Sequence, residues 1–114
     1  MKIPNYIVAA LKSAIFYKFF SYRRPVVLSM GITGRCNLKC TYCYSAHDNH
    51  NGHDVNLKTI ISRINQFYSL GTRVLMLQGG EPLIHPNLAD IVSYTKKKKM
   101  YCSITTNGIG IDKH

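Results

Sequence analysis

Acidic residues are scarce in this chain of 114 residues: five Asp and Glu stand against fifteen Lys and Arg, which gives a formal charge of +10. An excess of that sign favours anionic partners. Nucleic acid, acidic lipid headgroups and an acidic electron-donating protein all meet this condition, and the charge alone does not choose among them.

Two other features are missing from the sequence. No apolar run reaches the length needed to span a bilayer without an interrupting lysine. No pattern typical of a cleaved secretory signal precedes the cysteines, so we expect reduced thiols in the cytoplasm instead of disulfides. The hydrophobic fraction of 46% excludes a disordered chain, and the length predicts one domain at most.

Three of the four cysteines lie in one short stretch, R-C-N-L-K-C-T-Y-C-Y, at residues 35–44. They are spaced C-x3-C-x2-C, at Cys36, Cys40 and Cys43. Structural zinc normally takes four protein ligands, whereas three thiolates on a [4Fe-4S] cluster leave one iron open. The spacing favours a cluster and leaves open unligated thiols or a zinc site. Candidate fourth zinc ligands follow at His47, His50 and His53.

Short apolar runs at residues 26–32 and 73–78 are typical of strands buried in a parallel sheet, the first of them on both faces, and residues 100–106 predict a third strand. Helical periodicity predicts a helix from Leu57 to Tyr68, ended by Gly71, and another from Asn87 to about Lys97. The order βαβαβ implies parallel strands with right-handed crossovers, whose carboxyl ends share one edge. In α/β barrels that edge carries the active site.

The remaining segments carry weaker signals. Residues 45–53 are polar and predict a solvated loop, in which nothing else fixes a metal geometry for the histidines. Asp54 or Asn56 is expected to cap the following helix. Cys102 lies inside the third predicted strand without a nearby partner, so we interpret it as a buried thiol outside the cluster. The lysines at 96–99 suit a helix C-terminus, where cations interact favourably with the helix dipole.

Residues 3–20 predict a helix that is apolar around most of its circumference, with Pro4 in its first turn. A helix of this kind must be covered by something. Either it packs across a barrel, or it lies in a membrane interface with its aromatic side chains beside Lys18, Arg23 and Arg24. The sequence leaves both open.

The cysteine spacing, with Tyr42 just before the last cysteine, resembles the cluster motif of radical S-adenosylmethionine (SAM) enzymes. Two further segments match in the same order, Q-G-G-E-P-L at 78–83 and T-T-N-G at 105–108. The resemblance covers about residues 26–108 and is closest to the branch of the molybdenum-cofactor cyclase and the peptide-maturing enzymes. It implies an α/β fold: the N-terminal half of a partial (β/α)6 TIM-like barrel, with about three parallel strands, preceded by the apolar helix.

In that family three cysteines hold three irons and SAM chelates the fourth, so the resemblance implies a [4Fe-4S] cluster on the three cysteines above. It also implies that Gly79, Gly80 and Glu81 face the amino group of SAM. By the same resemblance Tyr42 lies near the adenine and Asn107 lines the SAM pocket. The implied activity is reductive cleavage of SAM to a 5′-deoxyadenosyl radical, which abstracts hydrogen from a substrate that the sequence does not identify.

The later strands of the family's barrel are absent from this sequence. We therefore interpret residues 25–114 as a truncated or split core domain behind a helix at residues 1–24, unable to turn over alone. The expected partners are a complementing C-terminal half and a reductase, flavodoxin or ferredoxin as electron donor. Peripheral membrane contact through residues 1–24 and contact with nucleic acid stay open.

Two other functions fit parts of the sequence. A zinc-binding basic module that interacts with RNA would use the charge and the histidines. A small iron–sulfur electron carrier would need a fourth cysteine ligand. Neither gives a role to the Gly-Gly-Glu-Pro and Thr-Asn-Gly segments, so both rank below the radical SAM hypothesis.

Overall fold

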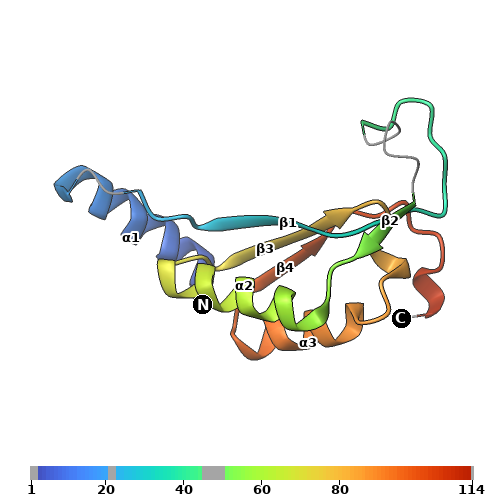
Figure 1. The fold of residues 1–114 in the computed structure, drawn as a ribbon. Coiled ribbons are helices and arrows are strands. Elements are labelled where there is room, and N and C mark those ends of the chain that lie inside the picture. Colours follow the sequence, from blue (N-terminus) through green and yellow to red (C-terminus); the bar gives the residue numbers. More distant parts are fainter. Residues whose placement is uncertain (1–2, 21–22, 45–50, 114) are drawn as a thin grey trace.

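The computed structural model describes residues 3–20, 23–44 and 51–113. Within these residues the chain forms an α/β fold around one mostly parallel sheet with the strand order β2-β1-β3-β4 (Figure 1). In chain order the elements are α1 (Asn5–Phe20), β1 (Val27–Arg35), β2 (Asn51–Asp54), α2 (Leu57–Leu70), β3 (Val74–Gly79), η2 (Pro82–Ile84), α3 (Leu88–Lys97), β4 (Tyr101–Ile104) and η3 (Ile111–Lys113). The predicted parallel βαβαβ order, preceded by a helix, is confirmed.

The three parallel strands β1, β3 and β4 begin and end at nearly the same register positions of the sheet. Val74 at the start of β3 pairs with Val27 of β1 and with Tyr101 of β4. At the other end Gly79 pairs with Thr33. Each pairing runs in the same direction, so the three carboxyl ends meet at one edge of the sheet. The segments singled out in the sequence all follow these carboxyl ends.

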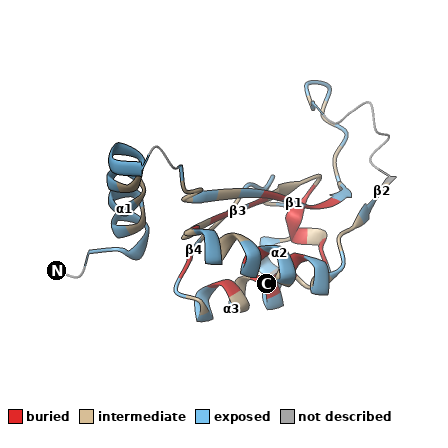
Figure 2. Ribbon diagram, turned by 60° about the vertical axis from the view of Figure 1, so that its left-hand side comes forward, coloured by how far each residue is buried: buried red, intermediate tan, exposed pale blue. Residues whose placement is uncertain are grey.

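Helices α2 and α3 cover one face of the sheet and form the core with it (Figure 2). Burying a side chain of this size stabilises a fold by about 1.5–3 kcal/mol relative to leaving it exposed. The core side chains with 0% exposure are Ile32, Ile60, Ile64, Leu75, Leu77 and Ile91.

The opposite face of the sheet is open in the part of the chain that the structure describes. Exposure alternates along β1, and Val27 is 51% exposed. Met76 in the central strand β3 is 37% exposed. The prediction that both faces of β1 are buried is therefore wrong here, because the described helices α2 and α3 lie on one face only.

The predicted loop at residues 45–53 is wrong at its end, where strand β2 begins. Residues 51–54 pair antiparallel with the end of β1, in the register Thr33 to Asp54. Gly34 and Gly52 lie so close that a side chain on either would overlap the backbone of the other. The rest of the predicted loop, including His47 and His50, lies outside the described residues.

The next helix, α2, is capped by one of the two predicted residues. The Asn56 side chain accepts a hydrogen bond from the backbone N–H of Lys58 at 2.8 Å. Asp54, the other candidate, binds Thr33 and Arg35 instead. Gly71 ends the helix in a left-handed conformation with φ of 114°, as the sequence predicted.

Helix α1 lies at the amino-terminal end of the strands, at the opposite end of the sheet from the loop after β1 (Figure 1). The Asn5 side-chain amide donates to the Lys99 carbonyl at 3.4 Å, and the rings of Tyr6 and Tyr101 have centroids 5.7 Å apart. None of the helix residues is buried. Among the described residues no helix is both long and apolar enough to cross a membrane.

Candidate cofactor site

A cavity of about 190 Å³ lies at the carboxyl edge of the sheet. It joins the three segments that the sequence singled out, from the loop after β1, the end of β3 and the turn after β4. The lining residues include Cys36, Cys40, Cys43, Gly79, Gly80, Glu81, Thr105, Thr106 and Asn107. All but one of the residues predicted for the site therefore face a single space.

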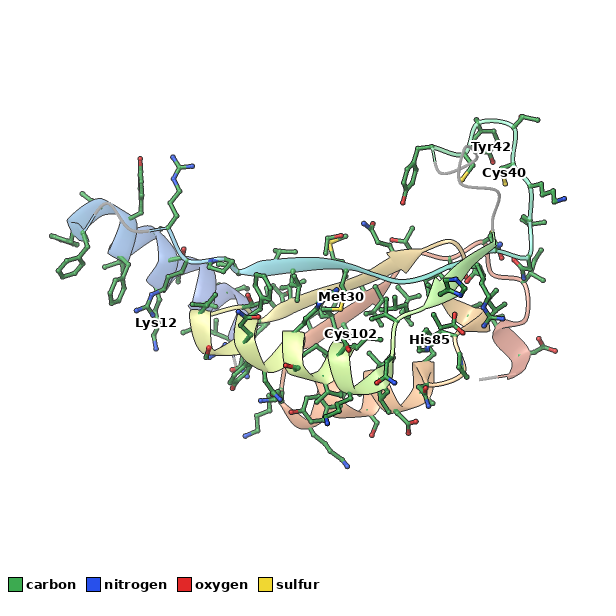
Figure 3. All side chains as sticks on the ribbon, viewed as in Figure 1. Lys12, Met30, Cys40, Tyr42, His85 and Cys102 are labelled. Atoms are coloured by element: carbon green, nitrogen blue, oxygen red, sulfur yellow. The ribbon has the colours of Figure 1, made fainter. Side chains whose placement is uncertain are left out.

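Tyr42 is the exception. It is 89% exposed and does not line the cavity, whereas Tyr44 does. Figure 3 shows Tyr42 with Cys40 on the loop that rises above the sheet. Its predicted place near the adenine of SAM stays a prediction.

The three loop cysteines are half-buried, and none of the four cysteines is in a disulfide. The backbone N–H of Leu38 donates to the Cys36 sulfur at 3.4 Å, and Cys43 N–H donates to the Cys40 carbonyl at 3.2 Å. Among the described residues, no group of three or more His, Cys, Asp or Glu is arranged to hold a metal ion. Binding of a metal group would therefore have to bring the three sulfurs closer together, at the expense of part of its binding free energy.

The two glycines at the end of β3, Gly79 and Gly80, allow its backbone to lie against the end of β1. Gly80 N–H donates to the Thr33 carbonyl and Glu81 N–H donates to the Arg35 carbonyl, both at 2.8 Å. Gly79 has φ of 143°, and a side chain on Gly80 would overlap the Arg35 carbonyl. The Gly-Gly-Glu segment is thus fixed directly beside the residue that precedes Cys36.

Glu81 is 1% exposed, and protein groups engage both its carboxylate oxygens. Oε1 accepts from the Thr106 hydroxyl at 2.7 Å and from the Leu83 N–H at 2.8 Å. Oε2 accepts from the Asn107 N–H at 2.8 Å. The carboxylate therefore ties the end of β3 to the turn after β4.

Asn107 connects that turn to the cysteine loop. Its side-chain amide donates to the Asn37 side-chain carbonyl at 2.8 Å. Its own side-chain oxygen accepts from the Ile109 N–H at 2.9 Å, which holds the turn. Asn37, next to Cys36, was not predicted as a site residue, although its position inside the cysteine motif was a usable signal.

A second group of residues that the sequence analysis missed closes the base of the cysteine loop. Arg35 forms a two-bonded ion pair with Asp54, with Nη2 to Oδ2 at 2.7 Å and Nε to Oδ1 at 3.0 Å. The buried Thr33 hydroxyl donates to Asp54 at 2.7 Å. Burial alone would raise the pKa of Asp54, but the hydrogen bonds from Arg35 and Thr33 and the charge of Arg35 outweigh it and lower the pKa.

This ion pair predicts a pH-dependent stability. A carboxylate with a lowered pKa stabilises the fold at neutral pH, and the contribution is lost as the pH falls through the folded-state pKa. We expect Asp54→Asn to lower the free energy of unfolding by about 1 kcal/mol or less at pH 7, because the pair is partly exposed. The difference should shrink below about pH 4. Urea titrations between pH 7 and 2.5 measure it, and a difference that is the same at every pH would contradict it.

His85 was also missed, and nothing in the sequence pattern marks it. It is 1% exposed; Nε2 donates to the Val55 carbonyl at 3.0 Å, and Nδ1 accepts from the Asn87 N–H at 3.1 Å. A carbonyl only accepts and a backbone N–H only donates, so these partners fit a neutral ring. His85 ties η2 to the segment between β2 and α2 below the site.

Cys102 lies within β4, as the sequence predicted, but it is half-buried and not fully buried. Burial raises the pKa of its thiol, with the charge of Lys96 acting weakly in the opposite direction. It lines a separate cavity of about 690 Å³ beside α3. Cys102 is therefore apart from the other three cysteines.

Comparisons with known proteins agree with this geometry. The family model of the radical SAM superfamily matches residues 30–114. A probable GTP 3′,8-cyclase of Archaeoglobus fulgidus is 35% identical over 94 residues, which are 82% of this chain and 31% of the relative. The Fe-coproporphyrin III synthase of Methanosarcina barkeri is 34% identical over 113 residues, which are 98% of this chain and 26% of the relative. The chain thus spans less than a third of the length of these relatives.

Solved structures show the same fold. SuiB of Streptococcus suis bound to S-adenosylmethionine has a TM-score of 0.66 at 24% identity, covering 90% of this chain and 24% of SuiB. SuiB bound to its precursor peptide SuiA has a TM-score of 0.70 at 22% identity. The predicted partial barrel is confirmed by this likeness, and neither the zinc module nor the electron carrier is favoured by any of these matches. A [4Fe-4S] cluster and SAM are the cofactors of the matched superfamily. Because the match extends over most of the sequence, this chain belongs to the radical SAM superfamily.

Proposed function

We propose that this chain supplies the cofactor-binding part of a radical SAM enzyme. Cys36, Cys40 and Cys43 would hold three irons of a [4Fe-4S] cluster, and SAM would bind the fourth. The observation that carries the proposal is the single cavity shared by the three cysteines, the Gly-Gly-Glu segment and the Thr-Asn-Gly turn. Neither the zinc module nor the electron carrier gives a role to the Gly-Gly-Glu segment and the Thr-Asn-Gly turn.

The donor set fits this pair of cofactors. Three half-buried thiols face one space, which suits a cluster with one open iron better than a closed tetrahedral site. Cys102 lines a different cavity and is therefore no candidate for a fourth ligand. When bound and reduced, the cluster would supply the electron for reductive cleavage of SAM.

The residues after β3 and β4 would orient SAM. Because Glu81 is 1% exposed and already accepts three hydrogen bonds from protein donors, we assign the contact with the amino group of SAM chiefly to the backbone of Gly79 and Gly80. Glu81 would then hold that backbone and the Asn107 turn at a fixed separation. Asn107 lines the cavity and would limit the space beside the cysteine loop.

Hydrogen abstraction from a substrate is proposed for a larger assembly. The relatives are more than three times as long as the part that this chain matches. One face of the sheet is open among the described residues, and a complementing C-terminal part would cover it and supply the substrate wall. The formal charge of +10 favours an acidic electron donor of the flavodoxin or ferredoxin type.

Electron paramagnetic resonance tests the proposal. The chain is reconstituted anaerobically with iron and sulfide, reduced with dithionite and measured with and without SAM. We expect a cluster signal that changes shape when SAM is added, because SAM would ligate the open iron. A Cys102→Ser chain, whose altered thiol lies away from the cavity, should behave identically. A signal indifferent to SAM would refute the SAM site, and the absence of any signal would refute the cluster.

A further inference from the structure

The surface of α1 is unusual for a helix at the edge of a domain. None of its residues is buried, although most of them are apolar. Two phenylalanines at its end, Phe19 and Phe20, are 72% and 71% exposed. The other large apolar residues exposed on the helix and just before it are Ile3, Tyr6, Ile7, Val8, Leu11, Ile15 and Tyr17.

The body of the protein supports α1 only weakly. Ser13 bonds to the Arg24 carbonyl at 3.0 Å, and a cavity of about 330 Å³ lies under the helix between Val8 and Arg73. Arg24 stacks on Phe16 and Arg23 on Tyr17, so two cations sit against the helix aromatics. These few contacts leave most of the apolar surface of α1 without protein cover among the described residues.

The charge around α1 is of one sign. Residues 1–24 contain no Asp or Glu. The last turn of α3 and the two residues after it carry four consecutive lysines at 96–99, and Asn5 of α1 donates to the Lys99 carbonyl. The exposed cations of this surface are Lys12, Lys18, Arg23 and Lys99. We define the α1 surface as residues 3–20 with these cations.

We infer that the α1 surface docks on an anionic lipid bilayer, with α1 lying in the headgroup region. Exposed aromatic and aliphatic side chains beside Lys and Arg are the two features that hold an interfacial helix. The apolar area buried in the interface and the attraction of each cation to an anionic leaflet both add to the binding free energy. Nucleic acid would use the cations but gives no role to the exposed Phe19 and Phe20.

This placement leaves the cofactor site accessible. Strand β1 runs from the α1 end of the molecule to the cysteine loop (Figure 1). Nine strand residues at about 3.3 Å each separate the two ends by roughly 30 Å. A chain docked through α1 would therefore keep its cysteine loop directed away from the bilayer, where an electron donor from solution can reach it.

Co-sedimentation of the full chain with vesicles tests the inference. Phosphatidylcholine vesicles with and without phosphatidylglycerol are compared at low and high salt. We expect binding to the anionic vesicles only, weakened by salt. Lys12→Gln with Lys18→Gln should weaken it by roughly thirtyfold, given the increment for two cations. Phe19→Ser with Phe20→Ser should weaken it by roughly tenfold or more.

A matched control makes the result specific. Lys58→Gln with Arg63→Gln removes the same charge from exposed positions of α2, and Gln has nearly the helix propensity of Lys and Arg. This control should bind as the unaltered chain does. Equal loss in the control and the α1 variant would overturn the inference, as would no binding to anionic vesicles. A third result would also overturn it: an RNA oligonucleotide that binds tightly, displaces the vesicles and has the same affinity for the variant with Phe19→Ser and Phe20→Ser.

Discussion

Alanine at any one of Cys36, Cys40 or Cys43 is expected to abolish the cluster. Each variant leaves only two thiolates, so two of the four irons would lack a protein ligand. We do not expect a cubane cluster to be held in that way. Iron and sulfide after anaerobic reconstitution should fall from about four of each per chain to near zero. Colorimetric iron and sulfide assays, with absorbance near 400 nm, measure this result.

The control for this experiment is built into the chain. Cys102→Ala removes a thiol of β4 that lines a different cavity, so its iron content should match the unaltered chain. Circular dichroism of each apoprotein separates cluster loss from unfolding, because the loop cysteines are only half-buried and contribute little to the core. Iron retained in all three loop variants would refute the assignment of these residues as ligands. Zinc at one per chain without sulfide would support the alternative metal instead.

The second large effect is expected from Gly80→Ala. A methyl group at this position would overlap the Arg35 carbonyl and approach the Cys36 backbone N at 3.1 Å. Backbone atoms cannot turn aside as a flexible side chain would, so the end of β3 must move away from β1. We expect a loss of roughly 3 kcal/mol or more in the free energy of unfolding, measured with urea on the apoprotein.

Gly31→Ala is the matched comparison, because the same methyl group there meets no atom within 4 Å. Gly31 lies in β1, and alanine in a strand costs less backbone entropy than glycine. Its unfolding midpoint should therefore equal or slightly exceed that of the unaltered chain. Equal midpoints for the two alanine variants would contradict the close packing of the Gly-Gly-Glu segment on β1.

These effects follow from how the site is held together. Gly80 and Glu81 extend the contact between β3 and β1 up to the first cysteine. Glu81 then fixes the turn after β4, and Asn107 returns from that turn to Asn37. The three segments form a closed circuit of hydrogen bonds around the cavity. A change in any one segment is therefore transmitted to the cysteine loop.

The sequence by itself determined the metal ligands proposed here, the order of the elements and the edge that carries the site. Cysteine spacing is a local property, and apolar runs with helical repeats between them are enough to order parallel strands. The strands near 26–32, 73–78 and 100–106 and the caps at Asn56 and Gly71 were predictable for this reason.

Only the tertiary structure decided what the polar side chains at that edge do. Glu81 meets Thr106 and Asn107 from positions 25 and 26 residues away, and Asn107 meets Asn37 across 70 residues. The strand at Asn51–Asp54 has no strand-forming residues; it depends on the contact of Gly34 with Gly52 and on the Arg35–Asp54 ion pair. Such pairings depend on the folded path of the chain, because no short-range pattern distinguishes an acid that binds a ligand from one that joins two strand ends.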